Sequence, residues 1–271
     1  MSIVSRFAPS PTGYLHLGHA YSAWQARRRA DVLRLRLEDI DATRCRPEFA
    51  AAIEEDLHWL GLDWDGPVRV QSAHFPEYAA ALASLQARGL LYPCFCSRAD
   101  ILRASAAPHA AEQTYPGTCR HLSATEREQK IAAGALYALR LDNAAARAQA
   151  GGAQKYFEEG TGWIAARPEQ LGDVVLARRD SPASYHLCVV HDDADQNITH
   201  VVRGEDLREA THIHVLLQAL LGVPTPIYAH HKLLLGPDGR RLAKRDRSKT
   251  LREMRAAGTT AASILQEFEA A

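Results

Sequence analysis

The chain has 271 residues, which suits one large domain or two small ones. Hydrophobic residues make up 46% and charged residues 24%, a composition that supports a sizeable core and excludes a disordered chain. The 32 lysines and arginines balance 32 aspartates and glutamates, so the net charge gives no support for nonspecific polyanion binding. The apolar stretches fall far short of the roughly 20 residues that span a bilayer, and residues 1–13 lack the apolar centre of a signal peptide. We therefore expect a cytoplasmic protein without membrane contact.

The first third of the chain alternates short apolar stretches with segments of helical periodicity. We predict strands at residues 2–7, 32–37 and 90–95, and helices at residues 18–30, 47–60 and 74–87. Pro47 suits the first turn of its helix, because proline fixes a helical φ angle and needs no hydrogen-bond acceptor there. Strands that alternate with helices in this way predict a parallel α/β sheet.

The middle of the chain has a different composition. Residues 96–172 are rich in alanine, glycine and arginine, and their periodicity is weak, so we interpret them as an insertion. The α/β pattern then resumes, with helices predicted at 185–191 and 207–221 and strands at 198–203 and 227–235. Beyond a turn at 236–239, the chain is basic and then helical.

A loop rich in proline and glycine, Pro9–His19, separates the first predicted strand from the first predicted helix. In parallel α/β sheets, ligands bind at this position, and a helix N-terminus attracts phosphate. His16 and His19 can donate hydrogen bonds to phosphate oxygens, and Gly18 allows a nucleotide to approach the backbone. The alternative is an ordinary turn with two surface histidines.

The residues of this loop resemble a known signature. Arg6–Gly13 (RFAPSPTG), followed by His16-Leu17-Gly18-His19, is similar to the opening of the glutamyl- and glutaminyl-tRNA synthetases. The last four residues resemble the HIGH signature of class I aminoacyl-tRNA synthetases. The resemblance implies a Rossmann-type catalytic domain in which His16, Gly18 and His19 bind ATP together with Mg²⁺.

A second segment resembles the other class I signature, KMSKS. Arg240–Arg245 (RRLAKR) follows an apolar stretch, and Lys244 matches the essential lysine of that signature. A lysine can neutralise charge on a transferring phosphoryl group. A solvated basic hairpin is the alternative. The resemblance implies adenylate chemistry with His16, His19 and Lys244 as the catalytic residues, with Lys244 also in the ATP site.

Charged side chains at strand ends suggest an amino-acid pocket. Arg6, Glu38 and Arg203 end three predicted strands and are expected at one edge of the sheet. Arginine binds a carboxylate in a bidentate manner, and Glu38 can pair with an ammonium group. Tyr185 can hydrogen-bond a substrate carboxylate, and the resemblance adds Ser10 near the amino group. Alternatively, Glu38 lies in a solvated loop and Tyr185 is a core aromatic.

Three cysteines lie close together in the sequence. Cys94, Cys96 and Cys119 can supply three thiolates to a structural zinc ion, which needs a fourth ligand. Chemistry alone favours a histidine, His109 or His121, over a tyrosine. The resemblance favours Tyr115, because Cys-x-Cys followed by Tyr-x-x-x-Cys is similar to a zinc site of this family. Three unrelated core thiols are the alternative.

The chain ends soon after Thr250, so we expect no anticodon-binding domain. The closest resemblance is then to the shortened glutamyl-Q tRNA(Asp) synthetases. These activate L-glutamate with ATP without tRNA and attach it to the queuosine base in the anticodon loop of tRNA(Asp). The alternatives are a glutamyl-tRNA synthetase fragment that charges the 3′ end of tRNA(Glu), a nucleotidylyltransferase, and a non-catalytic tRNA-binding module.

These expectations combine into one domain plan for a monomer. We expect residues 1–91 and 185–235 to form a split Rossmann-type α/β catalytic domain, and residues 92–184 to form an inserted subdomain that resembles an acceptor-binding domain and holds the zinc site. We expect residues 236–271 to form the KMSKS-like loop and a short C-terminal helical segment that resembles a stem-contact segment. This last stretch has a local excess of basic residues, which suits an RNA backbone.

Overall fold

The computed structural model describes residues 2–97, 99–101, 115–234 and 249–270. A parallel sheet of three strands opens the chain: β1 (Val4–Phe7), β2 (Val32–Leu37) and β3 (Arg69–Val70). The helices α1 (Leu17–Arg27) and α2 (Pro47–Leu60) connect these strands. Each predicted element from residue 2 to residue 60 is present, and the helix that starts at Pro47 has the predicted bounds.

A second sheet has the strand order β7-β6-β10-β9. Its strands are β6 (Lys155–Glu158), β7 (Gly162–Ala165), β9 (His200–Gly204) and β10 (Ile227–His231). β10 runs parallel to both β9 and β6, whereas β6 and β7 form an antiparallel hairpin. The helices α7 (Tyr185–Asp195) and α8 (Ala210–Leu221) belong to this half, as predicted.

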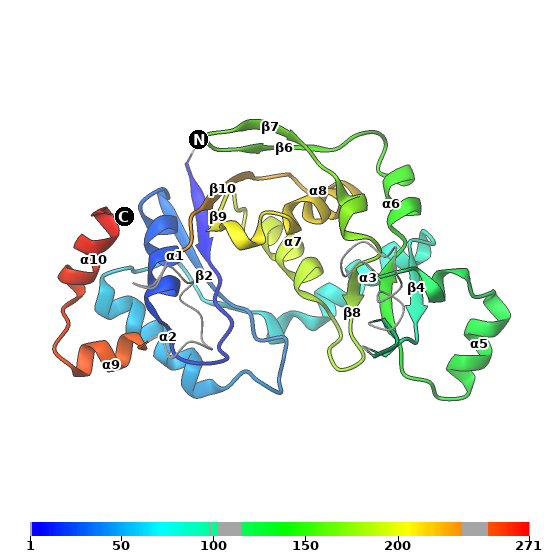
Figure 1. The fold of residues 1–271 in the computed structure, drawn as a ribbon, viewed down its shortest axis with the longest axis horizontal. Helices are drawn as coiled ribbons and strands as arrows, with labels where there is room; N and C mark the ends of the chain where they lie inside the picture. Colours follow the sequence, from blue (N-terminus) through cyan, green and yellow to red (C-terminus); the bar gives the residue numbers. More distant parts are fainter. Residues whose placement is uncertain (1, 98, 102–114, 235–248, 271) are drawn as a thin grey trace.

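The two sheets meet at β1 and β9 (Figure 1). The backbone N–H of Val4 donates to Oγ1 of Thr199 (2.9 Å), and the backbone N–H of Thr199 donates to the carbonyl of Val4 (3.0 Å). The strands therefore follow one another as β3-β2-β1 and then β9-β10-β6, with the order reversing between β1 and β9. A reversal of this kind leaves a crevice at the carboxyl ends of the strands.

A third, antiparallel sheet corrects one prediction. It consists of β4 (Leu91–Cys94), β5 (Ala138–Leu141) and β8 (Val175–Ala177). The predicted strand at 90–95 is real, but its assignment to the parallel sheet is wrong, since β3 takes that place. A buried apolar stretch looks the same in either sheet, and a strand of two residues has no periodicity to detect.

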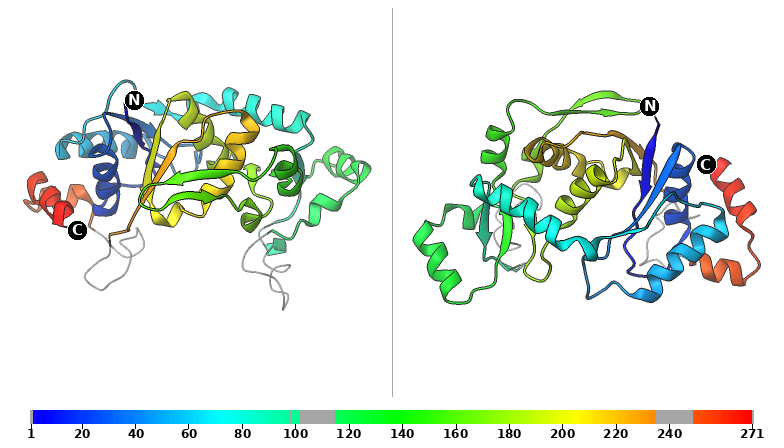
Figure 2. Two further views of the ribbon diagram at one scale, coloured as in Figure 1. Left: turned by 90° about the horizontal axis from the view of Figure 1, so that it is seen from above. Right: turned by 180° about the vertical axis from the view of Figure 1, so that it is seen from behind.

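Most of the range 92–184, which was predicted to be an insertion, lies at the end of the molecule opposite the C-terminal helices (Figures 1 and 2). It includes the helices α5 (Ala124–Ala132) and α6 (Asn143–Gln149). The helix α3 (Phe75–Ala87) leads into it and packs against α7 and α8. Although β6 falls in the range 92–184, it pairs with β10 of the second sheet, so this range also contributes to the sheet that carries the site.

The C-terminal segment is helical, as expected, with α9 (Leu251–Ala256) and α10 (Ala261–Ala270). Phe268 of α10 is buried, and its ring lies 5.3 Å from that of Tyr21 and 5.8 Å from that of Trp24, both on α1. Ile264 joins the same core beside α2. Short 3₁₀ turns complete the structure: η1 (Gln71–His74), η2 (Thr118–His121), η3 (Pro168–Leu171) and η4 (Glu205–Leu207). Among the described residues, no helix is long and apolar enough to cross a membrane.

Candidate active site

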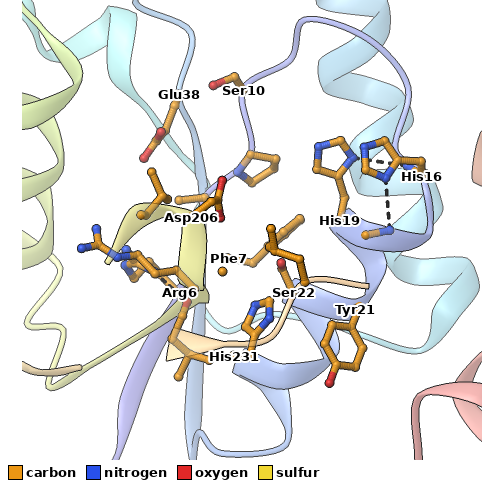
Figure 3. A pocket seen from close by; sticks show the side chains of 18 of the residues that line it. Arg6, Phe7, Ser10, His16, His19, Tyr21, Ser22, Glu38, Asp206 and His231 are labelled. Carbon is orange, nitrogen blue, oxygen red and sulfur yellow. Dashed lines mark hydrogen bonds between the residues drawn. The ribbon is translucent and has the colours of Figure 1, made fainter. Parts of the chain in front are cut away.

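A pocket of about 440 Å³ opens at the carboxyl ends of β1, β2, β9 and β10, where the strand order reverses. Eight residues predicted to bind glutamate or ATP line it: Arg6, Ser10, His16, Gly18, His19, Glu38, Tyr185 and Arg203. Figure 3 shows Arg6 and Glu38 on one side of the pocket and the two loop histidines on the other. Lys244, the remaining predicted residue, lies outside the described residues.

The two histidines cap the N-terminus of α1. Nδ1 of His16 accepts the backbone N–H of Gly18 (3.1 Å), and Nδ1 of His19 accepts the backbone N–H of His16 (3.3 Å). Their ring centroids are 3.8 Å apart. A neutral imidazole whose Nδ1 accepts a hydrogen bond carries its proton on Nε2. Both rings are therefore Nε2–H donors at a helix N-terminus, a combination that favours phosphate.

The C-terminal segment is joined to this histidine loop. The backbone N–H of Leu251 donates to the carbonyl of Leu15 (2.8 Å), and Thr250 forms a β-bridge with His16. Arg252 lies 5.4 Å from the centre of the Tyr14 ring. The chain that follows residues 235–248 is thus held beside the N-terminus of α1.

Arg6 is fixed at the pocket wall by an ion pair. Its Nε donates to Oδ1 of Asp193 (3.0 Å), and another guanidinium nitrogen donates to the carbonyl of Val202 (3.2 Å). Asp193 also accepts a hydrogen bond from Arg36 at 2.8 Å. Burial raises the pKa of the Asp193 carboxyl, but the charges of Arg6 and Arg36 outweigh burial and hold this pKa below its usual value.

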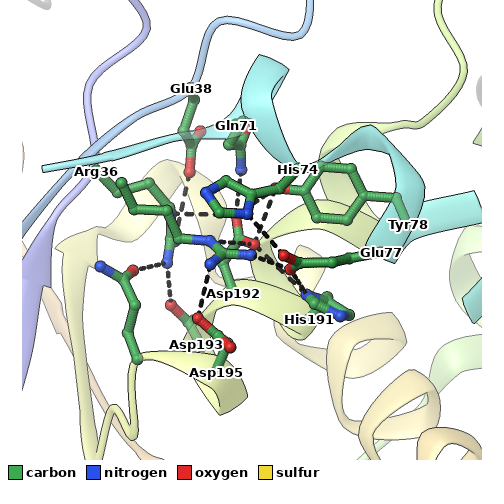
Figure 4. A network of polar contacts seen from close by, with 12 residues as sticks. Arg36, Glu38, Gln71, His74, Glu77, Tyr78, His191, Asp192, Asp193 and Asp195 are labelled. Atoms are coloured by element: carbon green, nitrogen blue, oxygen red, sulfur yellow. Dashed lines mark hydrogen bonds and ion pairs between the residues drawn. The ribbon is translucent and has the colours of Figure 1, made fainter.

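Asp193 belongs to a buried network that the sequence analysis missed (Figure 4). Its neighbour Asp192 accepts hydrogen bonds from Nε of Arg69 (2.8 Å), Nε2 of Gln71 (2.8 Å) and the hydroxyl of Tyr78 (2.9 Å). The two acids follow Val189 and Val190 in a helix that faces the core. Adjacent acids in such a helix need basic partners on neighbouring elements, and this signal could have revealed the network.

Glu38 follows β2 and faces the pocket with its side chain only 11% exposed. Its Oε1 lies 3.5 Å from the Arg36 guanidinium. Burial raises the pKa of Glu38 to about 7, although the charges of Arg36 and Arg6 act in the opposite direction. The predicted alternative of a solvated loop is therefore wrong. Because burial removes water from the Glu38 carboxylate, this group is suited to pair with a cationic group of a ligand.

Arg203, at the end of β9, is surrounded by neutral acceptors. Its guanidinium nitrogens lie 3.1 Å from Nε2 of His230, 3.3 Å from Nδ1 of His214 and 2.7 Å from Oγ1 of Thr211. Within the described part of the chain, no carboxylate oxygen lies within 4.0 Å of this guanidinium. A buried arginine without an anionic neighbour is suited to bind the carboxylate of a ligand.

The histidines around Arg203 are uncharged at neutral pH. Burial, together with the charge of Arg203, lowers the pKa of His230 to about 4 and that of His186 to about 4. Burial also holds the pKa of His214 well below its usual value. Tyr185 begins α7 beside these rings, and burial raises its pKa, so it remains a neutral phenol. These histidines and the Tyr185 phenol therefore add no charge to that of Arg203.

The three predicted cysteines converge in the inserted region. The Sγ atoms of Cys94, Cys96 and Cys119 lie within 4.8 Å of one another, with 3.5 Å between those of Cys96 and Cys119. The Tyr115 hydroxyl lies 3.6 Å from the Cys96 Sγ and accepts the backbone N–H of Cys119 (2.8 Å). His121 is exposed and is not part of this group among the described residues, and His109 lies outside them.

The pocket therefore has two chemical ends. One end carries Arg203, Arg6, Glu38 and the Tyr185 phenol, which suits a zwitterion with extra carboxylate. The other end carries two imidazole donors at the N-terminus of α1, which suits phosphate. The sequence analysis did not single out four further lining residues: Tyr21, Ser22, Asp206 and His231. These four residues belong to no sequence motif, so only the structure identifies them as part of the pocket.

Comparisons with known proteins agree with this chemistry. The family profile described as "tRNA synthetases class I (E and Q), catalytic domain" matches residues 2–268. The chain is 48% identical to the glutamyl-Q tRNA(Asp) synthetase of Rhodobacter capsulatus over 97% of this chain and 98% of that protein. It is 43% identical to the protein of the same name from Symbiobacterium thermophilum, over 97% and 84% of the two chains.

A solved structure shares the fold. The glutamate-tRNA synthetase of Elizabethkingia anophelis superimposes with a TM-score of 0.76 at 28% identity, covering 91% of this chain and 53% of that one. The match thus spans about half of the longer synthetase. The chain belongs to the catalytic-domain family of the class I glutamyl- and glutaminyl-tRNA synthetases and, within it, to the glutamyl-Q tRNA(Asp) synthetases.

Proposed function

We propose that this enzyme activates L-glutamate with ATP in the absence of tRNA and then transfers the glutamate to queuosine in the anticodon loop of tRNA(Asp). The observation that carries the proposal is the convergence of eight predicted residues on one pocket. The names of the relatives, which match over nearly the whole chain, supply the acceptor.

In the first half-reaction, an α-carboxylate oxygen of glutamate attacks the α-phosphorus of ATP, and pyrophosphate leaves with its bonding electrons. No protein nucleophile is needed, so catalysis consists of positioning and charge stabilisation. We assign the Nε2–H groups of His16 and His19 to the phosphate oxygens and Gly18 to close backbone approach. Lys244 supplies a further positive charge, and Mg²⁺ enters with ATP and neutralises phosphate charge.

The substrate glutamate has two carboxylates and one ammonium group. We assign the ammonium group to Glu38 and Ser10, and the carboxylates to Arg6, Arg203 and the Tyr185 hydroxyl. The buried, unpaired charge of Arg203 favours a ligand that arrives with a second negative charge. Glutamine lacks that charge and is expected to bind more weakly.

In the second half-reaction, a hydroxyl of the queuosine cyclopentenediol attacks the carbonyl carbon of glutamyl-adenylate. An ester forms, AMP leaves, and the hydroxyl proton passes to solvent or to AMP. A base that is splayed out of an RNA loop can enter an open pocket, whereas a stacked base cannot. The basic residues of the C-terminal segment, such as Arg252 and Arg255, suit the RNA backbone.

We also propose a structural zinc ion on Cys94, Cys96, Tyr115 and Cys119. Zinc–sulfur bonds of about 2.3 Å give a tetrahedron with edges of about 3.8 Å. The contacts of 3.5 Å between the Cys96 and Cys119 sulfurs, and 3.6 Å from the Cys96 sulfur to the Tyr115 oxygen, fit such edges. The ion would fix the irregular start of the inserted region.

Two measurements test the function. Purified protein with ATP, magnesium and glutamate should exchange labelled pyrophosphate into ATP without tRNA, and glutamine should support far less exchange. Nuclease mapping of tRNA(Asp) charged with labelled glutamate should then place the label on the anticodon-loop fragment. Label on the 3′-terminal adenosine, or on tRNA(Glu), would instead identify the alternative, a glutamyl-tRNA synthetase fragment. A lack of glutamate-dependent exchange would contradict the activation step.

A further inference from the structure

Arg203 is connected to an acid on another strand through a histidine. The Arg203 Nε donates to Nε2 of His230 (3.1 Å), and Nδ1 of His230 lies 2.8 Å from Oε2 of Glu158. The three residues belong to β9, β10 and β6, which are neighbours in the second sheet. The side chain of His230 is fully buried and that of Glu158 is 2% exposed, so water does not compete for these contacts.

These contacts define the protonation of the His230 ring. Arg203 is always a donor, so the facing Nε2 must be an acceptor. A neutral imidazole that accepts at Nε2 carries its proton on Nδ1, and this proton points at the Glu158 carboxylate. The acid therefore selects the tautomer of His230, and the tautomer gives Arg203 an acceptor at the required position.

Glu158 is itself held in one orientation. Its Oε1 accepts hydrogen bonds from the Arg208 guanidinium (3.1 Å) and from the backbone N–H of His230 (3.2 Å). Nδ1 of His230 lies 2.8 Å from Oε2 and 3.0 Å from Oε1, so Oε2, which does not contact Arg208 or the backbone, is the nearer oxygen. The negative charge of Glu158 is thus kept one imidazole ring away from Arg203, whose own charge remains directed to the pocket.

We propose that Glu158 is a positioning residue for glutamate: through the Nδ1–H tautomer of His230, it holds Arg203 toward the substrate carboxylate without neutralising it. This inference rests on the proposed binding of glutamate by Arg203. It assigns a role in the pocket to a residue of the range 92–184, which was predicted to form an inserted subdomain rather than part of the catalytic domain.

We call the contacts from Glu158 through His230 to Arg203 the relay. The variant Glu158→Gln tests it with minimal change of shape. The amide oxygen takes the position of Oε1, where it still accepts from Arg208 and the backbone. The amide NH₂ then faces Nδ1 of His230 and donates to it, which moves the ring proton to Nε2. Two donors now face each other between His230 and Arg203. We expect the KM for glutamate in pyrophosphate exchange to rise about tenfold, which corresponds to about 1.4 kcal/mol, while the KM for ATP stays within about twofold.

A matched control is available at the residue that follows β6. Glu159→Gln removes the next acid along the chain, which is 40% exposed and pairs with Arg29 at 3.4 Å. It should leave both KM values unchanged. The ¹⁵N shifts of the His230 ring give a readout independent of activity: the wild type should show the Nδ1–H tautomer and Glu158→Gln the Nε2–H tautomer. A role of Glu158 in folding alone would not change the tautomer.

Two substitutions of His230 separate the halves of the relay. His230→Gln carries its amide to the position of Nε2, so its oxygen can still accept from Arg203, and glutamate KM should rise by about threefold at most. His230→Asn keeps its amide near Glu158 and leaves Arg203 without this acceptor, so glutamate KM should rise about tenfold. The reverse order of these two effects would overturn the proposal.

The outcomes also separate this inference from the proposed function. If the wild type exchanges pyrophosphate with glutamate but Glu158→Gln keeps the wild-type glutamate KM, the relay is wrong and the function stands. Equal losses in the glutamate and ATP constants would also contradict it, because they would indicate general damage. If the wild type shows no glutamate-dependent exchange, the function itself fails, and the tautomer measured by NMR still decides whether Glu158 controls His230.

Discussion

Two arginines of the pocket differ in what surrounds them. Arg6 shares the carboxylate of Asp193 with Arg36, so most of its charge is balanced within the protein. Arg203 has imidazole and hydroxyl acceptors instead of an acid. The same residue type therefore serves two purposes: Arg6 provides a rigid donor, whereas Arg203 provides charge for the ligand. The sequence alone, which places both at strand ends, does not distinguish these two roles.

Glu38 leads to a prediction about pH. Burial raises the pKa of Glu38 to about 7, so a falling pH protonates it and removes the charge that pairs with the substrate ammonium group. The KM for glutamate should therefore rise as the pH falls from 8 to 6, by up to about tenfold for a group that titrates near 7. Pyrophosphate exchange at several glutamate concentrations measures this.

The variant Glu38→Gln provides the control for the pH effect. It should bind glutamate weakly at every pH and lose the dependence between pH 6 and 8, because it has no proton to gain. A wild-type KM that stays constant across this interval would show that Glu38 is not the group that receives the ammonium.

At the scale of the element, prediction succeeded where the local pattern is strong. The helix at Pro47–Leu60 has its proline at the start, apolar residues at helical spacing and Gly61 in a left-handed conformation (φ 68°) at its end. The strand β3 (Arg69–Val70) was missed because two residues carry no period. β6 (Lys155–Glu158) was missed because its partner β10 is distant in sequence, and pairing of this kind depends on tertiary contacts.

The candidate site likewise contains residues that the sequence predicts and residues that it does not. The histidine loop and the strand-end charges could be predicted, because a motif and the last residues of a strand can be recognised from the sequence alone. Glu158, His230 and Asp193 could not, since each acts through a side chain that is remote in the sequence. A buried acid becomes visible only when the element that carries its basic partner has been placed.

The cysteine cluster leads to the prediction for the inserted region. One zinc ion per chain should be found by elemental analysis, and Cys96→Ser should lose it, because the remaining ligands no longer complete a tetrahedron. Melting temperature should fall with zinc loss, while pyrophosphate exchange should change less, since the cluster and the pocket share no residue.

Substitution of two of the three candidates for the fourth ligand, Tyr115 and His121, provides the controls. Tyr115→Phe should weaken zinc binding, whereas His121→Ala should retain the full content because His121 is exposed and apart from the sulfur group. The opposite result would assign the fourth ligand to the histidine. Protein that contains no zinc after purification in metal-sufficient medium would refute the site.

At the scale of the whole molecule, one buried acid joins several elements. Asp192 on α7 contacts Arg69 of β3, Gln71 of η1 and Tyr78 of α3, and its carboxylate lies 3.8 Å from Arg36 of β2. The two halves of the catalytic sheet are thus linked through charges as well as through β1 and β9. Removing one member of such a network leaves its partners buried without compensation.

Asp192→Asn should therefore destabilise the protein by about 3 kcal/mol, as expected for a buried acid whose arginine partners lose their counter-charge. Urea unfolding of both proteins measures the difference. Burial raises the pKa of Asp192, but His191 and Arg36 outweigh burial and lower it overall, so this contribution is present at neutral pH and is lost as the pH falls below the ordinary range of an aspartate.

Asp195→Asn is the matched control, since Asp195 also pairs with Arg69 but is 50% exposed. Its cost should stay below about 1 kcal/mol, because water can replace an exposed carboxylate. Equal costs for the two variants would indicate that burial of the network contributes nothing to stability.

The attachment of the C-terminal helices to α1 has a consequence for Lys244. Thr250 is held at His16, and Phe268 anchors α10 against Tyr21 and Trp24. On the other side, Leu233 and Leu234 line the pocket. In the sequence, Lys244 lies between these two attachments, six positions before Thr250. We expect that detaching the last two helices would weaken the proposed contribution of Lys244 to ATP binding without altering any residue that lines the pocket.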